Sequence, residues 1–299
     1  MKKQDLHGYV PAIATPFTAR GEIMEDAFLQ LLEFLLNRGA SSVCIAGDNG
    51  ESWALTPAER GRLVRLAKDA AGDRIPIIMG ISAPTIAACT QYIKQARDNG
   101  ADALLSMPPT YVLKSSEDEL FARFDQINNS TDLPIILYNS PRRAGYSLTV
   151  AQTRALAERY HIIGIKESQR DFFYHSHLLH DLADEMSIMT GPCHYILPAF
   201  ALGARGFIAT GPEFTTLAPD QMMRIGTAAP DTTYRKTHHE LTVIYQLLMG
   251  TATWPAAFKA ALNIIGLPAG VPRDPVAPAT PADIEKIKKI FHELGIISA

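Results

Sequence analysis

Cysteine is scarce in this sequence, with three residues among 299, and they lie far apart in the chain. A compact secreted domain built on disulfides usually has more cysteines, in an even number. The three residues, Cys44, Cys89 and Cys193, each stand among apolar neighbours. We therefore expect reduced, buried thiols and a cytoplasmic protein.

Long apolar segments and a strong net charge are also missing. No stretch approaches the roughly 18 consecutive apolar residues of a membrane-spanning helix. The polar segment 1–7 is not followed by the apolar core of a signal peptide. The formal net charge is -3, whereas a nucleic-acid-binding protein usually presents a strongly basic face. We expect neither a membrane span nor a nucleic-acid partner.

Aliphatic residues, by contrast, are abundant and regularly arranged. Hydrophobic residues make up 47% of the chain and charged residues 20%, which is typical of a soluble globular protein with a large core. Short aliphatic segments recur, each followed by a helical pattern, at the spacing of strand-loop-helix units. The expected strands are 9–14, 43–46, 75–79, 103–107, 133–138, 162–166, 186–190 and 206–209.

This repeat predicts an α/β protein with a (β/α)8 TIM barrel over residues 1–228. An open doubly wound sheet is the weaker alternative, because no Gly-x-Gly-x-x-Gly motif follows the first strand. After residue 228 the alternation stops, and helical patterns at 234–249, 254–265 and 281–294 predict three helices. We expect residues 229–299 to form a C-terminal three-helix appendage packed on the barrel, because its apolar faces need a partner.

Several helix boundaries are marked in the sequence. Thr56, Ser116 and Thr149 each precede a helical pattern and are followed three residues later by Glu or Gln, which is the pattern of a capping box. Gly39 and Gly100 follow helical patterns, and we expect both in the left-handed conformation that ends a helix.

The aliphatic segment 162–166 ends in a lysine, which is unusual for a buried strand. Burial disfavours the ammonium form and lowers the pKa of a lysine from its ordinary value near 10.4. A neutral Lys166 amine would be a nucleophile able to condense with a carbonyl group. A lysine that extends to solvent is the simpler interpretation of this segment alone. The residues at the other strand ends must therefore decide between the two.

Those residues favour the chemical interpretation, because catalytic groups of a TIM barrel lie at the carboxyl ends of the strands. Tyr138 ends the strand before Lys166. A tyrosine there is usually a packing residue with its hydroxyl in water, but a phenol beside an amine can also carry protons. Arg142 or Arg143 could bind a substrate carboxylate, with a solvated loop as the alternative. The turn 47–51, Gly-Asp-Asn-Gly-Glu, could point backbone N–H groups at an anion, or be an ordinary tight turn.

Two other groups of residues are expected to have no chemical role. His175, His177 and His180 do not share one face of the helix expected there, so we expect a solvated helix face and no metal site. Trp53 and Trp254 are expected to be packing residues.

Three motifs occur in order along the chain: Gly-x-x-Gly-Glu at 47–51, Tyr-Asn-x-Pro at 138–141 and Gly-Ile-Lys-Glu at 164–167. Together they resemble the dihydrodipicolinate synthase / N-acetylneuraminate lyase family, and the resemblance covers nearly the whole chain, including the tail. It implies a pyruvate-dependent class I lyase or aldolase with a (β/α)8 barrel, usually a homotetramer. Its lysine would form a Schiff base with a 2-oxo acid, with no other cofactor and no metal.

The resemblance also implies roles for single residues. Lys166 would form the Schiff base and Tyr138 would shuttle protons, while Tyr111 stands where many family members donate a tyrosine across a subunit boundary. Arg143 would bind the carboxylate of an aldehyde substrate, as in the dihydrodipicolinate synthase branch. The remaining substrate-binding positions are Asp48, Asn49, Gly50 and Ile208.

The sequence departs from the family pattern at Asp48 and Asn49, where the turn normally carries Ser or Thr hydroxyls. A hydroxyl both donates and accepts a hydrogen bond, whereas an ionised carboxylate only accepts. Asp48 also brings negative charge next to anionic substrates, which costs affinity unless something pairs with it. Asn49 can still donate to a carboxylate. This pair suggests a substrate that offers a hydroxyl or ammonium group to Asp48.

We therefore expect a Schiff-base-forming lyase or aldolase that acts on pyruvate or another 2-oxo acid with an aldehyde partner and resembles dihydrodipicolinate synthase. The alternative is an aldolase or dehydratase for 2-keto-3-deoxy sugar acids or hydroxylated 2-oxo acids. From other classes, a non-catalytic 2-oxo-acid-binding barrel and a divalent-metal aldolase remain open. The expected partners are these small molecules and further copies of the chain, as a dimer or tetramer.

Overall fold

The structure, a computed structural model, describes residues 1–110 and 115–298. Within them, eight parallel strands form one sheet in the order β1-β8-β7-β6-β5-β4-β3-β2. A parallel bridge between Ala12 and Cys44 joins the residues after β1 to β2 and closes the ring. The strands are β1 (Gly8–Tyr9), β2 (Val43–Ile45), β3 (Ile77–Gly80), β4 (Ala103–Ser106), β5 (Ile135–Asn139), β6 (Ile162–Glu167), β7 (Ser187–Thr190) and β8 (Gly206–Phe207).

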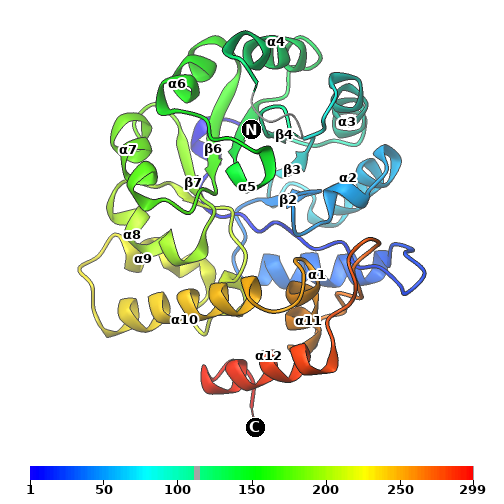
Figure 1. Ribbon diagram of the computed structural model, residues 1–299, viewed down its shortest axis with the longest axis vertical. Coiled ribbons are helices and arrows are strands. Elements are labelled where there is room, and N and C mark those ends of the chain that lie inside the picture. Colours follow the sequence, from blue (N-terminus) through cyan, green and yellow to red (C-terminus); the bar gives the residue numbers. More distant parts are fainter. Residues whose placement is uncertain (111–114, 299) are drawn as a thin grey trace.

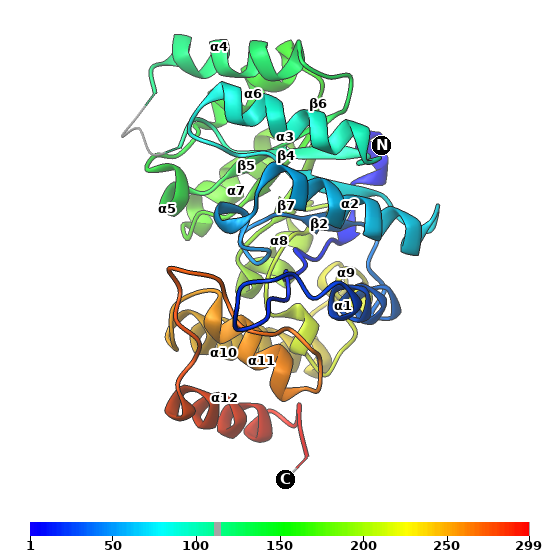
Figure 2. The same cartoon turned by 90° about the vertical axis from the view of Figure 1, so that its right-hand side faces the viewer.

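Helices surround this ring and extend it at one end (Figure 1). The helices that follow the strands are α1 (Glu25–Asn37), α2 (Pro57–Ala71), α3 (Ile86–Asp98), α4 (Glu117–Asn128), α5 (Pro141–Ala144), α6 (Val150–Arg159), α7 (Phe172–Leu182), α8 (Ile196–Ala201) and α9 (Met222–Gly226). The C-terminal helices are α10 (Thr232–Met249), α11 (Ala256–Ile264) and α12 (Pro281–Glu293). The (β/α)8 barrel with C-terminal helices is therefore confirmed. Figure 2 shows that α12 lies at the end of the molecule where the chain terminates.

The first strand is much shorter than the expected segment 9–14. Proline has no backbone N–H to donate to a strand ladder, and Pro11 interrupts this segment. Beyond Tyr9, the chain keeps single contacts with β2, such as the N–H of Ile13 that donates to the carbonyl of Cys44 at 3.1 Å. The chain thus follows the expected path with fewer ladder bonds.

The predicted helix boundaries agree with the structure. Thr56, Ser116 and Thr149 each cap a helix with both bonds of a capping box. Gly39 and Gly100 have φ angles of 82° and 86°, which is the left-handed region in which glycine has no steric penalty.

Two groups of apolar side chains fill the structure. One lies between the strands and the outer helices and continues into the C-terminal helices. The other fills the inside of the ring and includes Val10, Cys44, Ile136, Tyr138 and Ile208. The barrel is therefore a packed core rather than a pore, so chemistry is confined to its ends. The three cysteines are free and buried, as expected. No helix in the described part of the chain is long and apolar enough to cross a membrane.

Candidate active site

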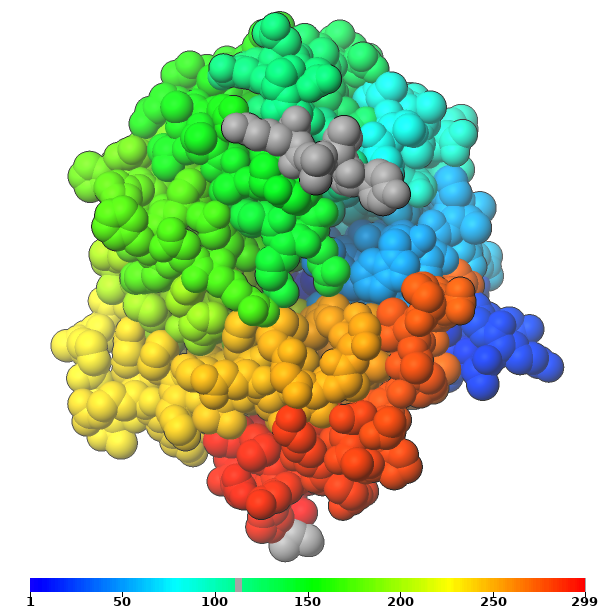
Figure 3. All heavy atoms as spheres, viewed as in Figure 1, coloured from blue at the N-terminus to red at the C-terminus, as the bar shows by residue number. Residues whose placement is uncertain are grey.

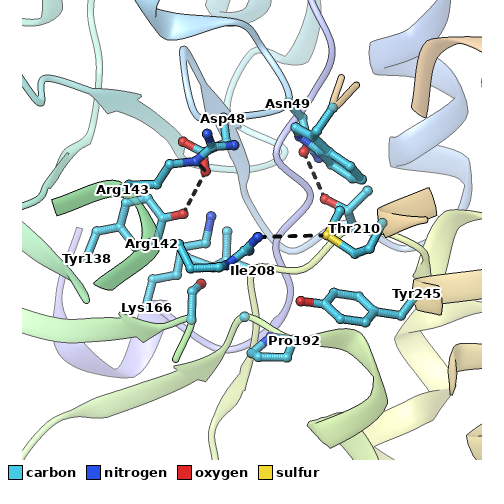
Figure 4. Close-up of a pocket in the computed structure, with 14 residues that line it drawn as sticks. Asp48, Asn49, Tyr138, Arg142, Arg143, Lys166, Pro192, Ile208, Thr210 and Tyr245 are labelled. Carbon is cyan, nitrogen blue, oxygen red and sulfur yellow. Dashed lines mark hydrogen bonds and ion pairs between the residues drawn. The ribbon is translucent and has the colours of Figure 1, made fainter. Parts of the chain in front are cut away.

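A polar pocket opens where the strands end, and the close-up in Figure 4 shows its side chains converging on it. Figure 3 shows a hollow on this face, between the segment around α5 and the C-terminal segment. The pocket is lined by residues from β5, β6, α5 and α10 and from the loops after β2, β6, β7, β8 and α10. They are Asp48, Asn49, Tyr138, Arg142, Arg143, Lys166, Ser168, Gly191, Pro192, Ile208, Thr210, Tyr245, Met249 and Trp254.

Lys166 is buried in this pocket rather than extended to solvent. Its side chain is 5% exposed, and its Nζ lies 4.2 Å from the centre of the Tyr138 ring. The two residues are register partners on β5 and β6, so both side chains leave the sheet on the same side. Burial lowers the pKa of Lys166, although the charge of Asp48 counteracts this effect. The local environment therefore favours the nucleophilic neutral amine.

Asp48 joins Tyr138 to Arg143. Its Oδ2 accepts a hydrogen bond from the Tyr138 hydroxyl at 3.0 Å and another from the Arg143 Nε at 3.0 Å (Figure 4). Burial, and then the nearby charge of Asp48, raise the pKa of Tyr138. The phenol is therefore protonated at neutral pH and donates to the carboxylate.

Arg143 supplies the positive charge that Asp48 needs. Burial by itself would lower the pKa of Arg143, but the charge of Asp48 and their hydrogen bond raise it. The ion pair is partly shielded, with side chains 36% and 19% exposed. Asp48 is thus compensated within the protein, and the Nε of Arg143 is engaged before any substrate arrives.

Asn49 holds the turn together instead of facing the pocket freely. Its amide nitrogen donates to the carbonyl of Ala12 at 2.9 Å, and its amide oxygen accepts from the Thr210 hydroxyl at 2.9 Å. The side chain is 2% exposed. The expectation that Asn49 donates to a substrate carboxylate is therefore limited to its second amide hydrogen. Its two hydrogen bonds link the loops after β1, β2 and β8.

Gly50 does not line the pocket, unlike Asp48 and Asn49 in the same turn. Its carbonyl accepts a hydrogen bond from Thr15 Oγ1 at 2.8 Å. A Cβ atom at this position would lie 3.1 Å from the carbonyl oxygen of Ile13, so the close approach of two backbone segments favours glycine. Any contact of Gly50 with a substrate would have to use its backbone.

The C-terminal region fixes the end of this turn. Glu51 has a left-handed φ of 54°, an uncommon conformation for a glutamate. Its buried carboxylate forms an ion pair of 2.5 Å with Lys259 of α11 and accepts the backbone N–H of Arg273 at 2.8 Å. Burial lowers the pKa of Lys259 to about 8, even though Glu51 favours its charged form. A helix and a loop distant in sequence thus hold the turn that carries Asp48.

The structure adds pocket residues that the sequence analysis did not identify. Tyr245 and Met249 come from α10, and Trp254 comes from the loop after it, where it also stacks on Phe258. Nothing in the local pattern of an amphipathic helix distinguishes a side chain that faces a pocket from one that faces a neighbouring element. The remaining additions are Ser168, Gly191, Pro192 and Thr210.

Three more residues named from the sequence remain to be placed: Trp53, Tyr111 and Ile208. Trp53 is 45% exposed, so the packing role expected for it is wrong; the guanidinium of Arg143 lies 5.9 Å from its ring centre. Tyr111 lies outside the described residues. Ile208 is buried and lines the pocket.

No group of three or more His, Cys, Asp or Glu side chains that could hold a metal occurs in residues 1–110 and 115–298. The three histidines of α7 do not converge. His175 is buried, with its Nε2 3.4 Å from the Thr190 hydroxyl, whereas His180 is exposed and paired with Asp181.

The fold and the pocket together define a (β/α)8 barrel protein with its polar site at the carboxyl ends of the strands. Comparison with known proteins gives the family. Residues 5–294 match the model of the dihydrodipicolinate synthetase family. The chain belongs to this family and is one of its lyases.

Relatives and solved structures match almost the whole chain. A 4-hydroxy-tetrahydrodipicolinate synthase of Moorella thermoacetica is 33% identical over 286 residues, which are 96% of this chain and 97% of the relative. An uncharacterized DapA-like lyase of Pyrobaculum arsenaticum is 29% identical and covers 98% of this chain and 99% of its own. The crystal structure of the dihydrodipicolinate synthase of Acinetobacter baumannii complexed with pyruvate has a TM-score of 0.89 and 27% identity, and covers 98% of this chain and 100% of its own.

Proposed function

We propose that this protein is a class I lyase in which Lys166 condenses with pyruvate or another 2-oxo acid. The enamine formed in this way adds to an aldehyde, or is released when a carbon–carbon bond is broken. One observation carries the proposal: a 5% exposed lysine amine lies 4.2 Å from the ring centre of a tyrosine in a polar pocket. A desolvated amine is a nucleophile near neutral pH, and a nearby phenol can transfer protons during carbinolamine formation and dehydration.

The turn 47–51 is the proposed site for the carboxylate of the 2-oxo acid. It stands beside Lys166 at the end of β2, and its glycines allow backbone N–H groups to approach an anion. The covalent intermediate is formed with the lysine itself, so the proposal includes no other cofactor and no metal.

A specific observation favours hydroxylated substrates within this class. The pocket is lined by the hydroxyl-bearing residues Ser168, Thr210 and Tyr245, besides the Asp48 carboxylate. Hydroxyl groups of a 2-keto-3-deoxy sugar acid would find both donors and acceptors there. An aldehyde that carries a carboxylate, as in dihydrodipicolinate synthesis, would instead need a guanidinium. The Nε of Arg143 is paired with Asp48, so such a substrate would have to use Arg142 or the other guanidinium nitrogens of Arg143.

The test is reductive trapping. Incubation with pyruvate and borohydride should add one pyruvate-derived group per chain, seen by intact mass and mapped to Lys166 by peptide sequencing. Lys166→Met should abolish the adduct. Lys94→Met removes an exposed lysine paired with Asp98 on α3 and should leave the adduct unchanged. No adduct on the wild-type protein, or an adduct elsewhere, would overturn the proposal.

The second reactant is identified by a turnover assay. Pyruvate is offered with a panel of aldehydes, one set carrying a carboxylate and one set carrying hydroxyls, and the products are followed by mass. Turnover of the hydroxylated set would support the sugar-acid version, and turnover of the carboxylated set the dihydrodipicolinate synthase-like version. An adduct on Lys166 without turnover of any aldehyde or sugar acid would instead indicate a binding protein.

The resemblance of the sequence to oligomeric enzymes supports a homo-oligomer, which we include in the proposal. Light scattering coupled to size-exclusion chromatography tests it directly. A mass of a single 32.7 kDa chain at assay concentrations would contradict it.

A further inference from the structure

The pocket contains a carboxylate that takes no part in the lysine chemistry described so far. Asp48 accepts two hydrogen bonds on one oxygen, from the hydroxyl of Tyr138 and the Nε of Arg143, each at 3.0 Å. These residues come from the loop after β2, from β5 and from α5, and are separated by 90 and 95 positions in sequence.

A carboxylate behind a phenol differs chemically from a hydroxyl in the same place. A hydroxyl must release its own proton when it receives another, so it only passes protons on. A carboxylate can take up a proton, hold it as the neutral acid and return it. The hydrogen bond from Tyr138 is in the direction that such a transfer requires, because the phenol is the donor and Asp48 is the acceptor.

We propose that Asp48 is the proton acceptor behind Tyr138, and that Arg143 is a positioning residue that holds Asp48 instead of binding the second substrate. This inference rests on the proposed Schiff base at Lys166. In the step concerned, the iminium formed from pyruvate loses a hydrogen from C3. The C–H electrons form the C=C bond of the enamine, and the C=N electrons become the nitrogen lone pair.

The proton leaves C3 for the oxygen of Tyr138 while the proton already on Tyr138 moves to Asp48. In aldol addition the enamine carbon attacks the aldehyde, and the alkoxide takes a proton from Tyr138, which recovers its own from Asp48. One proton is held and one is returned, so no external acid or base is consumed. Cleavage follows the same steps in reverse.

Arg143 is suited to the positioning role by its charge and its location. Without a neighbouring cation, Asp48 would stand in a pocket with few other groups to balance it. The groups whose charges act on Asp48 or its partners are Lys166 from β6, Cys44 from β2, Tyr138 and Arg143 itself. Cys44 is a buried thiol, and Lys166 is positively charged as the iminium but loses this charge when the enamine forms, so Arg143 is the permanent counter-ion in this set.

The experiment uses pyruvate alone, so the aldehyde does not need to be known. Exchange of the C3 hydrogens of pyruvate with D2O is followed by proton NMR, and the rate is divided by the fraction of chains that borohydride traps. Asp48→Asn keeps the shape of the side chain but cannot take up a proton. We expect its exchange rate per trapped chain to fall about 100- to 1000-fold. Asp48→Thr, which restores a hydroxyl, should lose rate as well.

Arg143→Met should also slow the exchange, because the guanidinium no longer holds Asp48 against the Tyr138 hydroxyl. The double variant Asp48→Asn/Arg143→Met should be no slower than Asp48→Asn alone, because Arg143 acts through Asp48. Asp125→Asn and Arg159→Met are the matched controls: they break an exposed ion pair of 3.1 Å outside the pocket and should leave the rate unchanged.

The outcomes separate this inference from the proposed function. If the wild-type protein traps no pyruvate, the proposed function itself is wrong. If it traps pyruvate but Asp48→Asn exchanges at the wild-type rate, only the role of Asp48 is overturned. If Arg143→Met exchanges at the wild-type rate, its positioning role is overturned. If Asp48→Asn does not trap pyruvate, the exchange rates per trapped chain of Asp48→Thr and Arg143→Met are used instead. A wild-type rate for Asp48→Thr overturns the role of Asp48, and a wild-type rate for Arg143→Met overturns the role of Arg143.

Discussion

Tyr138 and Lys166 are paired in register on neighbouring parallel strands, with the amine 4.2 Å from the centre of the phenol ring. The backbone register sets the side of the sheet on which both side chains lie, because side chains at paired positions of adjacent strands leave the sheet on the same side. Both residues are also buried, which restricts the positions that the amine can take relative to the ring. Such an arrangement is a favourable basis for a catalytic pair.

Lys166→Met should abolish the pyruvate adduct without destabilising the protein. The amine is buried and its pKa is lowered by burial, so folding is opposed by the loss of hydration of the ammonium. Methionine fills a similar volume without that cost. We expect the free energy of unfolding to be unchanged or higher by about 1 kcal/mol. Urea unfolding at neutral pH measures it, and a loss of several kcal/mol would contradict the prediction.

Lys259→Met should be strongly destabilising, in contrast to Lys166→Met. Lys259 pairs with Glu51 at 2.5 Å where both side chains are buried, and its removal leaves a buried carboxylate without its cation. We expect a loss of about 3 kcal/mol or more. Glu51→Gln in the same chain should recover part of the loss, because the uncompensated charge is then removed. Urea unfolding of the two single variants and the double variant gives the coupling energy, and simple additivity would argue against the pair.

Glu213→Gln should remove a pH-dependent loss of stability. Burial raises the pKa of Glu213 to about 7 in the folded chain, whereas the unfolded chain titrates near 4.5. Between these values the folded state binds more protons, so stability falls as pH rises from about 4.5 to 7 and stays low above 7. The loss is roughly 3 kcal/mol at most. The amide oxygen of Gln can still accept the N–H of Gly211.

Unfolding of wild-type protein and Glu213→Gln at pH 5 and pH 8 measures this effect. The variant should be the more stable of the two at pH 8, with a smaller difference at pH 5. A wild-type protein that gains more stability than the variant between pH 5 and pH 8 would contradict the prediction.

Treatment with a chelator should leave adduct formation and turnover unchanged. The proposed electrophile is the iminium on Lys166, which needs no metal ion to polarise a carbonyl. Activity is measured before and after dialysis against EDTA, and again after divalent cations are restored. Loss of activity with EDTA and recovery with one cation would instead support the divalent-metal aldolase.

The path of the chain could be read from the sequence because each strand of a parallel barrel is an aliphatic segment bounded by caps and turns. Lys166 and Tyr138 could be found for the same reason, since each ends such a segment. The pairing of Asp48 with Arg143 could not be predicted from the sequence, because the two residues are 95 positions apart and meet only when the strands close into a ring. The sequence also could not predict that Tyr245 and Met249 line the pocket, since only the packing of α10 on the barrel brings them there.

Tyr245, Met249 and Trp254 form a wall of the pocket that belongs to no barrel strand. The two parts of the chain thus contribute differently to the pocket. The strands carry the amine and the phenol, and the C-terminal region shapes the space beside them, where a second substrate would bind. Libraries of substitutions at these positions should therefore change the preference for the second substrate while leaving the proposed condensation at Lys166 intact. The tail is the natural place to begin changing the substrate range proposed for this protein.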